Sequence, residues 1–289
     1  MLNTQSRFKE VVVTYNYILI KHQGGVIVRE DYWSDVQEQG SNFQQHKEVN
    51  RQMKGRNNTP NTFKAKTDTN RDTTPLRPMN DRQSEYIDAI YNHAVVIATG
   101  VWGSSKTYIP SVIACDMLLA KKIDKIVVAR PAEGKAKSVG FYKGTKDEKL
   151  SGWVAPIADV FKKRLGIGHY EAYVENGKIE LLSLEQVKGR SWDNTFVIVD
   201  EAEDLAPEVA KSLVGRQGVN SITVVTGDID QKDLKSYSGL ELLLEVSKYG
   251  NIDMSIIDFD KWEYCVRSQE AKAWGMAFEK YERRNGRVK

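Results

Sequence analysis

Short apolar runs that alternate with helical segments constrain the fold of this chain more than any other feature. The runs are AVVIATG (94–100), DKIVVARP (124–131), IELLSL (179–184), TFVIVDEA (195–202) and SITVVTGD (221–228). Around them, segments such as DRQSEYIDAIYN (81–92) and KTYIPSVIACDMLLAKK (106–122) have the spacing of helices. Buried strands that alternate with helices are typical of a parallel sheet with helices on both faces. The sequence therefore predicts an α/β fold.

Several of these runs end in polar or acidic residues. Gly100 ends the first, Asp200 and Glu201 follow the core of the fourth, and Gly227 and Asp228 follow the fifth. In open parallel sheets, ligands bind at the carboxyl ends of the strands. We therefore expect a ligand site that these residues share.

The stretch TGVWGSSKTY (99–108) joins a predicted strand to a predicted helix. It matches the phosphate-loop pattern G-x-x-x-x-G-K-[ST] at Gly100, Lys106 and Thr107, but Ser105 replaces the second glycine. Such a loop points backbone N–H groups at phosphates, at the positive end of the helix dipole. Lys106 would reach the outer phosphates and Thr107 a magnesium ion. The alternative is a tight turn that leaves Lys106 on the surface.

The run TFVIVDEAEDLAP (195–207) delivers Asp200 and Glu201 to the end of a strand. Phosphoryl transfer uses one such carboxylate to hold magnesium and the next to polarise the attacking water. The alternative is that these acids only begin the following helix, where its dipole favours negative charge.

The run SITVVTGDIDQ (221–231) presents Thr226, Gly227 and Asp228 at a strand end, followed by Gln231. A glutamine amide both donates and accepts, so Gln231 could orient water or report whether a γ-phosphate is present. The alternative is an ordinary turn.

Residues 1–77 differ from the rest of the chain in composition and in sequence pattern. Residues 1–40 contain FKEVVVTYNYILIKHQGGVIVR, which predicts a β-hairpin with a glycine turn. Residues 41–77 are poor in apolar side chains, so we expect a flexible, basic linker there. It could be a solvated tether or an arm that touches a phosphate backbone. Residues 78–289 are the predicted catalytic domain.

Composition limits the cellular setting. The chain is 40% apolar and 28% charged, as is ordinary for soluble globular proteins, and its net charge of +3 says little about partners. No apolar run approaches the ~20 residues of a membrane span, and MLNTQSRFKE lacks a signal-peptide core. The cysteines, Cys115 and Cys265, predict neither a disulfide nor a zinc site. We expect a cytoplasmic protein without membrane contact.

The three motifs, in this order, resemble those of the PhoH-like ATPases, relatives of the superfamily 1 helicases. The resemblance runs from about Gln83 to Arg267. Its most specific part is VVARPAEGKAKSVGFYKGTKDEKL (127–150), because the pattern R-P…G-F-x-x-G has little use outside this family. The resemblance implies a RecA-like P-loop NTPase core that uses ATP and Mg²⁺.

The resemblance also implies roles for individual residues. Residues around ATP would be Gln83, Gly100, Val101, Trp102, Gly103, Ser104, Ser105, Lys106 and Thr107. Among these, Gln83 would contact the adenine edge, and Lys106 would also be catalytic. Thr107 and Asp200 would hold magnesium. Glu201 would act on the attacking water, and Gln231 on the γ-phosphate.

Four arginines, Arg130, Arg190, Arg216 and Arg267, fall at family positions where a guanidinium could face phosphate or nucleic acid. An arginine supplied across a subunit boundary is a common way to stabilise phosphoryl transfer. Arg216 and Arg267 are the predicted catalytic arginines. For each, a surface ion pair is the alternative.

The chain departs from the family pattern at three places. Ser105 stands where glycine is usual and would strain the loop unless its backbone angles are ordinary. Trp102 occupies a loop tip that usually carries a small residue, so it either packs on a neighbouring element or meets a partner. Pro110 cannot donate to the carbonyl of Lys106, which predicts a kink or a loosened first turn.

The resemblance implies an ATPase that acts with single-stranded RNA or DNA and is helicase-like. It also implies a homo-oligomer, namely a hexameric ring. The alternative is a nucleotide-responsive nucleic-acid-binding or regulatory protein with little or no turnover. Ser105 favours that alternative, whereas Lys106, Asp200, Glu201 and Gln231 favour hydrolysis. The Asp-Glu pair argues against a small-molecule kinase.

Overall fold

The computed structural model describes residues 71–130, 154–183, 186, 191–233, 236–250 and 252–285, and the backbone of three strands nearer the N-terminus. The region predicted from 127–150 to be most family-specific therefore lies largely outside the described residues. None of the helices in the described part has the length and apolarity to cross a bilayer.

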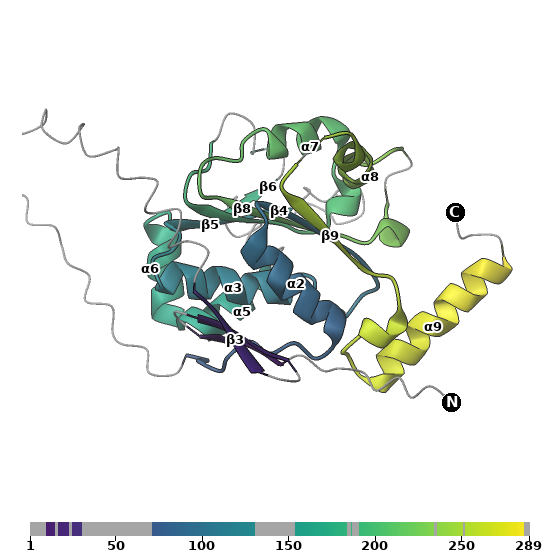
Figure 1. The fold of residues 1–289 in the computed structure, drawn as a ribbon. Helices are drawn as coiled ribbons and strands as arrows, with labels where there is room; N and C mark the ends of the chain where they lie inside the picture. The colour runs from purple at the N-terminus through teal and green to yellow at the C-terminus, as the bar shows by residue number, and fades with distance from the viewer. Residues whose placement is uncertain are drawn as a thin grey trace, which may run out of the picture.

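The centre of the molecule is a six-stranded, all-parallel sheet with the strand order β6-β5-β7-β8-β4-β9 (Figure 1). The strands are β4 (Val95–Gly100), β5 (Lys125–Arg130), β6 (Ile179–Ser183), β7 (Thr195–Val199), β8 (Ile222–Thr226) and β9 (Met254–Phe259). Every apolar run that predicted a strand forms one. The predicted α/β fold, with a RecA-like parallel sheet, is confirmed.

Helices cover both faces of the sheet (Figure 1). One face carries α2 (Asp81–Asn92), α3 (Tyr108–Leu119), α5 (Ala155–Leu165) and α6 (Ile167–Glu175). The other carries α7 (Pro207–Val214) and α8 (Gly239–Val246). The last helix, α9 (Gln269–Arg284), projects away from the sheet.

The two faces bury separate apolar cores because successive side chains of a strand point in opposite directions. In β5, Ile126 and Val128 join the core under α2, α3 and α5. Their neighbours Val127 and Ala129 join the core under α7 and α8. Since both side-chain sets are apolar, the strand is buried on both faces, which is why it reads as one continuous apolar run.

The N-terminal region differs from the prediction in two ways. A three-stranded antiparallel sheet replaces the predicted hairpin, because β1 (Glu10–Thr14) pairs with β2 (Tyr17–His22), which in turn pairs with β3 (Gly25–Glu30). The predicted hairpin corresponds to β2 and β3, which pair up to His22 and Gly25. The prediction was incomplete because it took the residues before HQGG as one strand, whereas they form both β1 and β2.

The end of the predicted linker 41–77 is anchored to the domain. The backbone N–H of Asp72 donates to the carbonyl of Lys163, at 2.7 Å. The Arg164 guanidinium donates to the carbonyls of Asp72 and Thr74 and pairs with Asp116. Because a buried guanidinium needs these acceptors, residues 72–74 are held against the domain, ahead of its predicted start at 78. The rest of the predicted linker, 41–70, lies outside the described residues.

Candidate active site

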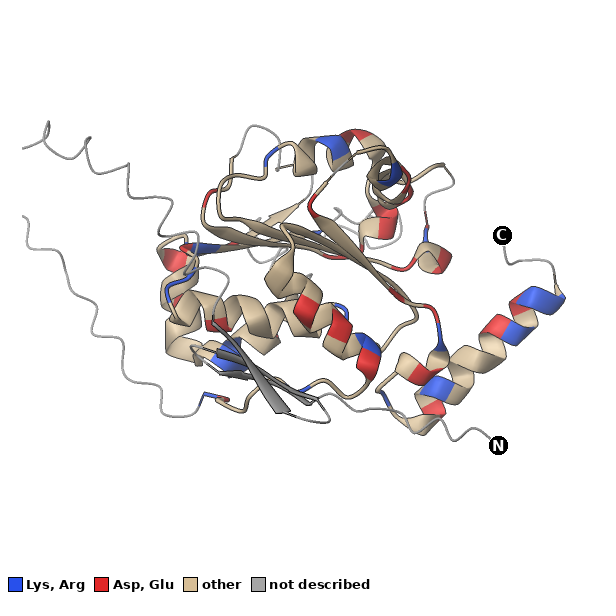
Figure 2. Ribbon diagram, viewed as in Figure 1, with Lys and Arg blue, Asp and Glu red and all other residues tan. Residues whose placement is uncertain are grey.

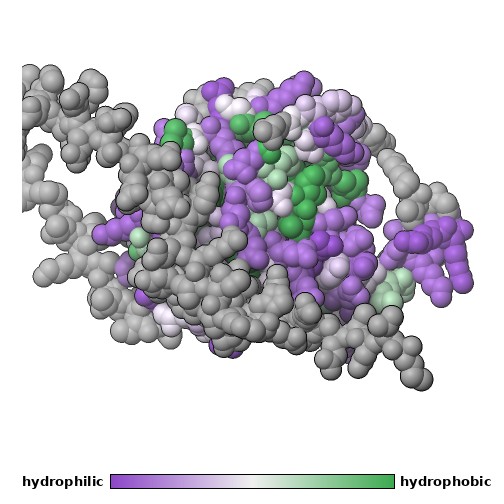
Figure 3. Space-filling model, in the orientation of Figure 1, coloured by the Kyte–Doolittle hydropathy of each residue, from purple (hydrophilic) through white to green (hydrophobic). Residues whose placement is uncertain are grey.

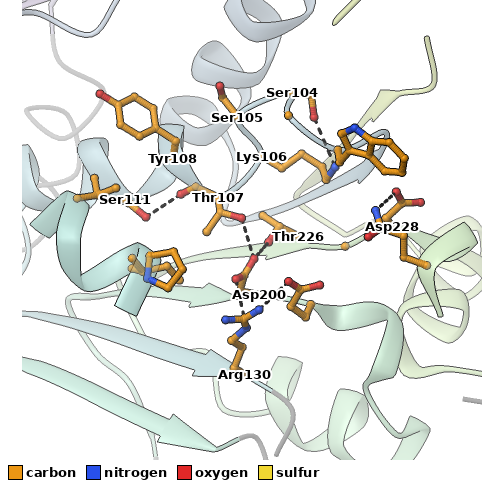
Figure 4. Close-up of a pocket in the computed structure, with 18 of the residues that line it drawn as sticks. Ser104, Ser105, Lys106, Thr107, Tyr108, Ser111, Arg130, Asp200, Thr226 and Asp228 are labelled. Atoms are coloured by element: carbon orange, nitrogen blue, oxygen red, sulfur yellow. Dashed lines mark hydrogen bonds and ion pairs between the residues drawn. The ribbon is translucent and has the colours of Figure 1, made fainter. Parts of the chain in front are cut away.

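A cavity of about 740 Å³ opens at the carboxyl ends of β4, β5, β7 and β8. It is lined by the loop 102–107, by Arg130, by residues 226–228 with Gln231, by Arg267 and by the acidic residues after β7. Part of the helix α5 forms an apolar wall. The three motifs that were read separately from the sequence therefore meet in one cavity (Figure 4).

The loop after β4 depends on backbone angles that favour glycine. Gly100 has φ 107° and Gly103 has φ 72°. A Cβ at Gly100 would lie 2.3 Å from the carbonyl oxygen of Phe259, so this glycine also permits a close approach of two strands. Ser105 has φ 70°. Its angles are therefore those of the glycine that the motif expects, and a side chain there costs about 1–2 kcal/mol.

Two buried side chains of α2, Gln83 and Tyr86, donate hydrogen bonds to backbone carbonyls of the loop. The amide of Gln83 accepts from the backbone N–H of Met79 at 2.8 Å and donates to the carbonyl of Ser104 at 3.1 Å. Gln83 is 2% exposed and does not line the cavity. The predicted contact with adenine would require these two bonds to be exchanged. In this structure Gln83 is a support of the loop.

The prediction at Pro110 was a kink or a loosened first turn, and the helix assignment is continuous through this residue. The helix α3 begins at Tyr108, two residues later than predicted, and runs without interruption. Pro110 therefore stands in the first turn, where an N–H has no partner within the helix. The buried Tyr86 hydroxyl donates to the Lys106 carbonyl at 2.8 Å, which supplies the hydrogen bond that Pro110 cannot make.

The side chain of Lys106 lies against its own loop. Its ammonium donates to the carbonyl oxygens of Gly100, at 2.5 Å, and Val101, at 2.7 Å. Val101 is held in turn by Phe259, whose carbonyl accepts its N–H at 2.9 Å, and by the Ser104 hydroxyl, which donates to its carbonyl. Burial lowers the pKa of Lys106, while nearby carboxylates oppose that shift.

The two predicted magnesium ligands meet. The Thr107 hydroxyl donates to Oδ1 of Asp200 at 2.7 Å, and the Thr226 hydroxyl donates to the same oxygen at 2.8 Å (Figure 4). A hydroxyl beside a carboxylate is a donor set that suits Mg²⁺, which keeps several waters and takes its other ligands from phosphates. Within the described ranges, no cluster of three or more His, Cys, Asp or Glu side chains forms a cage for another metal.

Arg130, at the end of β5, forms ion pairs with both members of the acidic pair. Its guanidinium lies 2.6 Å from Oε1 of Glu201 and 3.5 Å from Oδ2 of Asp200. Burial would raise the pKa of Glu201, but a hydrogen bond with Glu203 and the charge of Arg130 lower it. Glu201 also has φ 55°, an uncommon angle for a residue with a side chain. Glu201 is thus held ionised at the cavity wall.

Glu203 is a site residue that the sequence reading missed. Its side chain is buried and lines the cavity, and its carboxyl accepts the backbone N–H of Asp228 at 3.1 Å. A Cβ at Gly227 would lie 2.6 Å from this carboxyl, so glycine is required beside it. Burial, and then the hydrogen bond with Glu201, raise the pKa of Glu203 to about 8. Glu203 therefore connects the strand end of β7 to that of β8.

Gln231 also lines the cavity, in the short helix η4 (Ile229–Gln231). Its amide nitrogen donates to Oδ2 of Asp228 at 2.5 Å. Burial raises the pKa of Asp228, while the bond from Gln231 opposes that shift. The predicted γ-phosphate sensor is thus part of a short hydrogen-bonded chain from Gln231 through Asp228 to Glu203.

The four arginines separate into distinct places. Arg130 and Arg267 line the cavity, and the stem of Arg267 packs against Gly103. Arg216 lies at the amino ends of the strands, opposite the cavity. Its carbonyl accepts from the backbone N–H of Trp192, and the neighbouring Gln217 contacts the start of β4. Arg190 lies outside the described residues.

Trp102, at the loop tip, packs on the C-terminal region. Its ring lies edge-to-face with that of Trp262, in η6 (Trp262–Tyr264), with ring centroids 4.9 Å apart. The backbone N–H of Val266 donates to the Gly103 carbonyl at 2.9 Å. Of the two alternatives for Trp102, packing is therefore the one that the structure has.

A RecA-like parallel sheet with a phosphate-type loop after β4 and an acidic pair after β7 defines the class of P-loop NTPases. A model of the PhoH-like protein family matches residues 75–279. The chain belongs to that family.

Individual relatives agree with this assignment. The chain is 36% identical over 202 residues to Protein PhoH of Escherichia coli (strain K12), a match that covers 68% of this chain and 56% of the relative. It is 34% identical over 205 residues to a PhoH-like protein of Bacillus subtilis (strain 168), covering 70% and 63%. The match thus spans less than two thirds of either relative. Among solved structures, the UvsW helicase from bacteriophage T4 aligns with a TM-score of 0.40, at 12% identity, over 64% of this chain and 61% of that one.

Proposed function

We propose that this chain binds ATP together with Mg²⁺ in the cavity and hydrolyses the ATP. The observation that carries the proposal is the convergence of Thr107 and Thr226 on one oxygen of Asp200. Thr107 belongs to the loop of Lys106, and Asp200 is followed directly by Glu201. A phosphate chain that enters the cavity would therefore meet its cation ligands, its lysine and a carboxylate for water in one place.

Several protein groups would act on the bound nucleotide. Mg²⁺, held by Thr107 and Asp200, would neutralise charge on the outer phosphates. The Lys106 ammonium would exchange the carbonyls of Gly100 and Val101 for phosphate oxygens. Since the acidic groups around Lys106 raise its pKa against the effect of burial, they favour the charged form that phosphate binding needs.

Glu201 is the group that would orient the attacking water. It lies at the cavity wall, and its pKa is lowered, so it is available as a carboxylate. Its ion pair with Arg130 fixes where the carboxylate points. Arg130 would thus position Glu201, and it would also face the phosphates because it lines the cavity.

We further propose that hydrolysis is coupled to binding or remodelling of single-stranded RNA or DNA, and that the chain assembles into a hexameric ring in the cytoplasm. The family resemblance to superfamily 1 helicases supports the nucleic-acid part. Arg216 lies away from the cavity of its own chain, so the proposed catalytic role of Arg216 is a role in the site of a neighbouring copy. Arg267 lines the cavity of its own chain.

One observation favours the alternative of a nucleotide-responsive binding protein. Ser105 adopts φ 70°, and Lys106 is engaged by loop carbonyls, so the loop stores strain and must rearrange to meet phosphate. A loop of this kind can bind ATP and still turn it over slowly.

Phosphate release and ATP binding, measured on the same preparation, decide between the two. Release is followed with the full chain alone, with poly(U) and with single-stranded DNA, and Lys106→Ala is the control. Release above that control, stimulated by one of the polynucleotides, supports the proposed ATPase. ATP binding by the unmodified chain, with no more phosphate than Lys106→Ala produces, would favour the alternative.

A further inference from the structure

The helix α9 exposes an apolar stripe. Trp274 and Phe278 are 66% and 50% exposed, and their rings lie 5.9 Å apart. Residues spaced by three and four share one side of a helix, so Ala277 lies on the same stripe. We call Trp274, Ala277 and Phe278 the α9 stripe. Such a run of large apolar side chains is uncommon on a surface that no partner covers.

The stripe faces away from the body because α9 is held by a neighbouring side. A Cβ at Gly275 would lie 2.1 Å from the ring of Trp262, so this glycine lets the helix rest directly on that ring. One turn later, Glu279 accepts from the indole N–H of Trp262 at 2.6 Å. Gly275 is the buried residue of α9. These contacts with Trp262 therefore fix the orientation of the stripe.

A second uncovered apolar area lies at the edge of the sheet. Figure 3 shows a hydrophobic patch over the region of β9 and α8. The exposed residues there are Val246, Tyr249, Ile252 and Ile256, which we call the edge patch. β9 is an edge strand, with β4 on one side only. Proteins usually cover or charge such an edge, and this one carries apolar side chains.

Charges around the two surfaces are complementary. The last turn of α9 carries Arg283 and Arg284. Acidic residues border the edge patch, with Glu245 at the end of α8 and Asp258 in β9. Figure 2 shows both basic and acidic residues along α9, with Lys or Arg at its outer end, and acidic residues along β9. Both surfaces also carry the opposite sign, with Glu279 and Glu282 on α9 and Lys248 beside the edge patch. The two arginines against Glu245 and Asp258 are the charges that favour this direction of contact.

We infer that the α9 stripe of one copy of this chain docks on the edge patch of the next copy. Such a contact joins two different surfaces, so each copy keeps one of each available and the assembly grows head-to-tail, which is the kind of contact that a closed ring requires. The inference rests on the proposed self-assembly and names its surfaces. It does not depend on ATP hydrolysis, so the two can fail separately.

The first test compares substitutions by sedimentation velocity of the full chain over a range of concentrations, in buffer without nucleotide. Phe278→Lys and Ile256→Lys should each weaken self-association by about 30-fold or more, as expected for a central apolar anchor. Met276→Lys is the matched control, because Met276 is 52% exposed on the same helix but off the stripe. It should change association by about twofold or less.

Mixing the two defective variants is the decisive step. Phe278→Lys keeps an intact edge patch, and Ile256→Lys keeps an intact α9 stripe. Mixed at equal concentrations, at which neither variant associates alone, they should form a one-to-one dimer that grows no further. Circular dichroism and urea unfolding of each variant confirm that the domain is folded.

Three outcomes would overturn the inference. The unmodified chain could stay monomeric at every concentration. Met276→Lys could weaken association as much as Phe278→Lys does. The two variants could fail to form the mixed dimer, which would point to pairing of like surfaces. If the chain is monomeric and Phe278→Lys instead reduces binding to poly(U), the α9 stripe is a nucleic-acid surface and self-docking is wrong.

Discussion

The two halves of the cavity are held in shape by different means. The loop half, from Gly100 to Thr107, is fixed by backbone angles, by glycines in close contact and by buried supports behind it. The acidic half, from Asp200 to Gln231, is fixed by charged side chains that bond to one another. A shape held by the backbone is sensitive to a single added methyl group. A shape held by carboxyl groups is sensitive to pH.

The largest effect should come from the loop half. Gly100→Ala is expected to destabilise the protein by about 3 kcal/mol or more, because strain at positive φ and overpacking against Phe259 add together. Urea unfolding measures the loss. Gly177→Ala is the matched control, with φ 74° but nothing near its Cβ. An equal loss in both variants would show that the close approach to Phe259 adds nothing.

A substitution in the acidic half should change the rate of phosphate release. Glu201→Gln is expected to slow phosphate release by about 100-fold or more while ATP affinity changes little, because a general base is lost and the binding groups remain. Glu208→Gln, an exposed glutamate on α7, serves as the control. Near-normal release by Glu201→Gln would remove Glu201 from the catalytic role.

Glu203 should give the acidic half its pH dependence. Its pKa is about 8 in the folded protein and close to 4.5 without the fold, so the folded protein keeps a proton that the unfolded chain releases. The resulting stabilisation is complete below about pH 4.5 and is lost as pH rises to about 8. Glu203→Gln should flatten the decline in unfolding free energy over that range. Unfolding curves of the variant that still track the unmodified protein at every pH would contradict the assignment.

The smallest effect should come from relieving the backbone strain of the loop. Ser105→Gly is expected to stabilise the protein by less than about 1 kcal/mol, since relief of strain at φ 70° is partly offset by the greater freedom of glycine when unfolded. Ser105→Ala keeps the strain and removes the hydroxyl. If the alanine variant is stabilised as much as the glycine variant, the backbone angle is not the cause.

The same contrast explains what the sequence could predict. The strands followed from their apolar runs, and the loop followed from glycine spacing, because both signals are local. The pairing of Arg130 with Glu201 is not local, since 71 positions separate them. Glu203 stands among other acids in DEAED, and only the fold decides which of those side chains turns inward.

Two expectations about the loop depend on hydrogen-bond partners that the sequence does not reveal. Gln83 was expected at the adenine and Pro110 was expected to disturb α3. Both depend on which groups already satisfy the backbone of the loop. Gln83 bonds to the Ser104 carbonyl and Tyr86 to the Lys106 carbonyl, and both donors come from a helix that ends before the loop begins. Sequence spacing does not reveal such partners.

The contact between Trp102 and Trp262 has a thermodynamic consequence. It joins the tip of the nucleotide loop to the residue on which α9 rests. If docking of α9 on another copy shifts the affinity of the loop for nucleotide by some factor, nucleotide must shift the affinity between copies by the same factor. Measuring either quantity in the presence and absence of the other ligand therefore determines both.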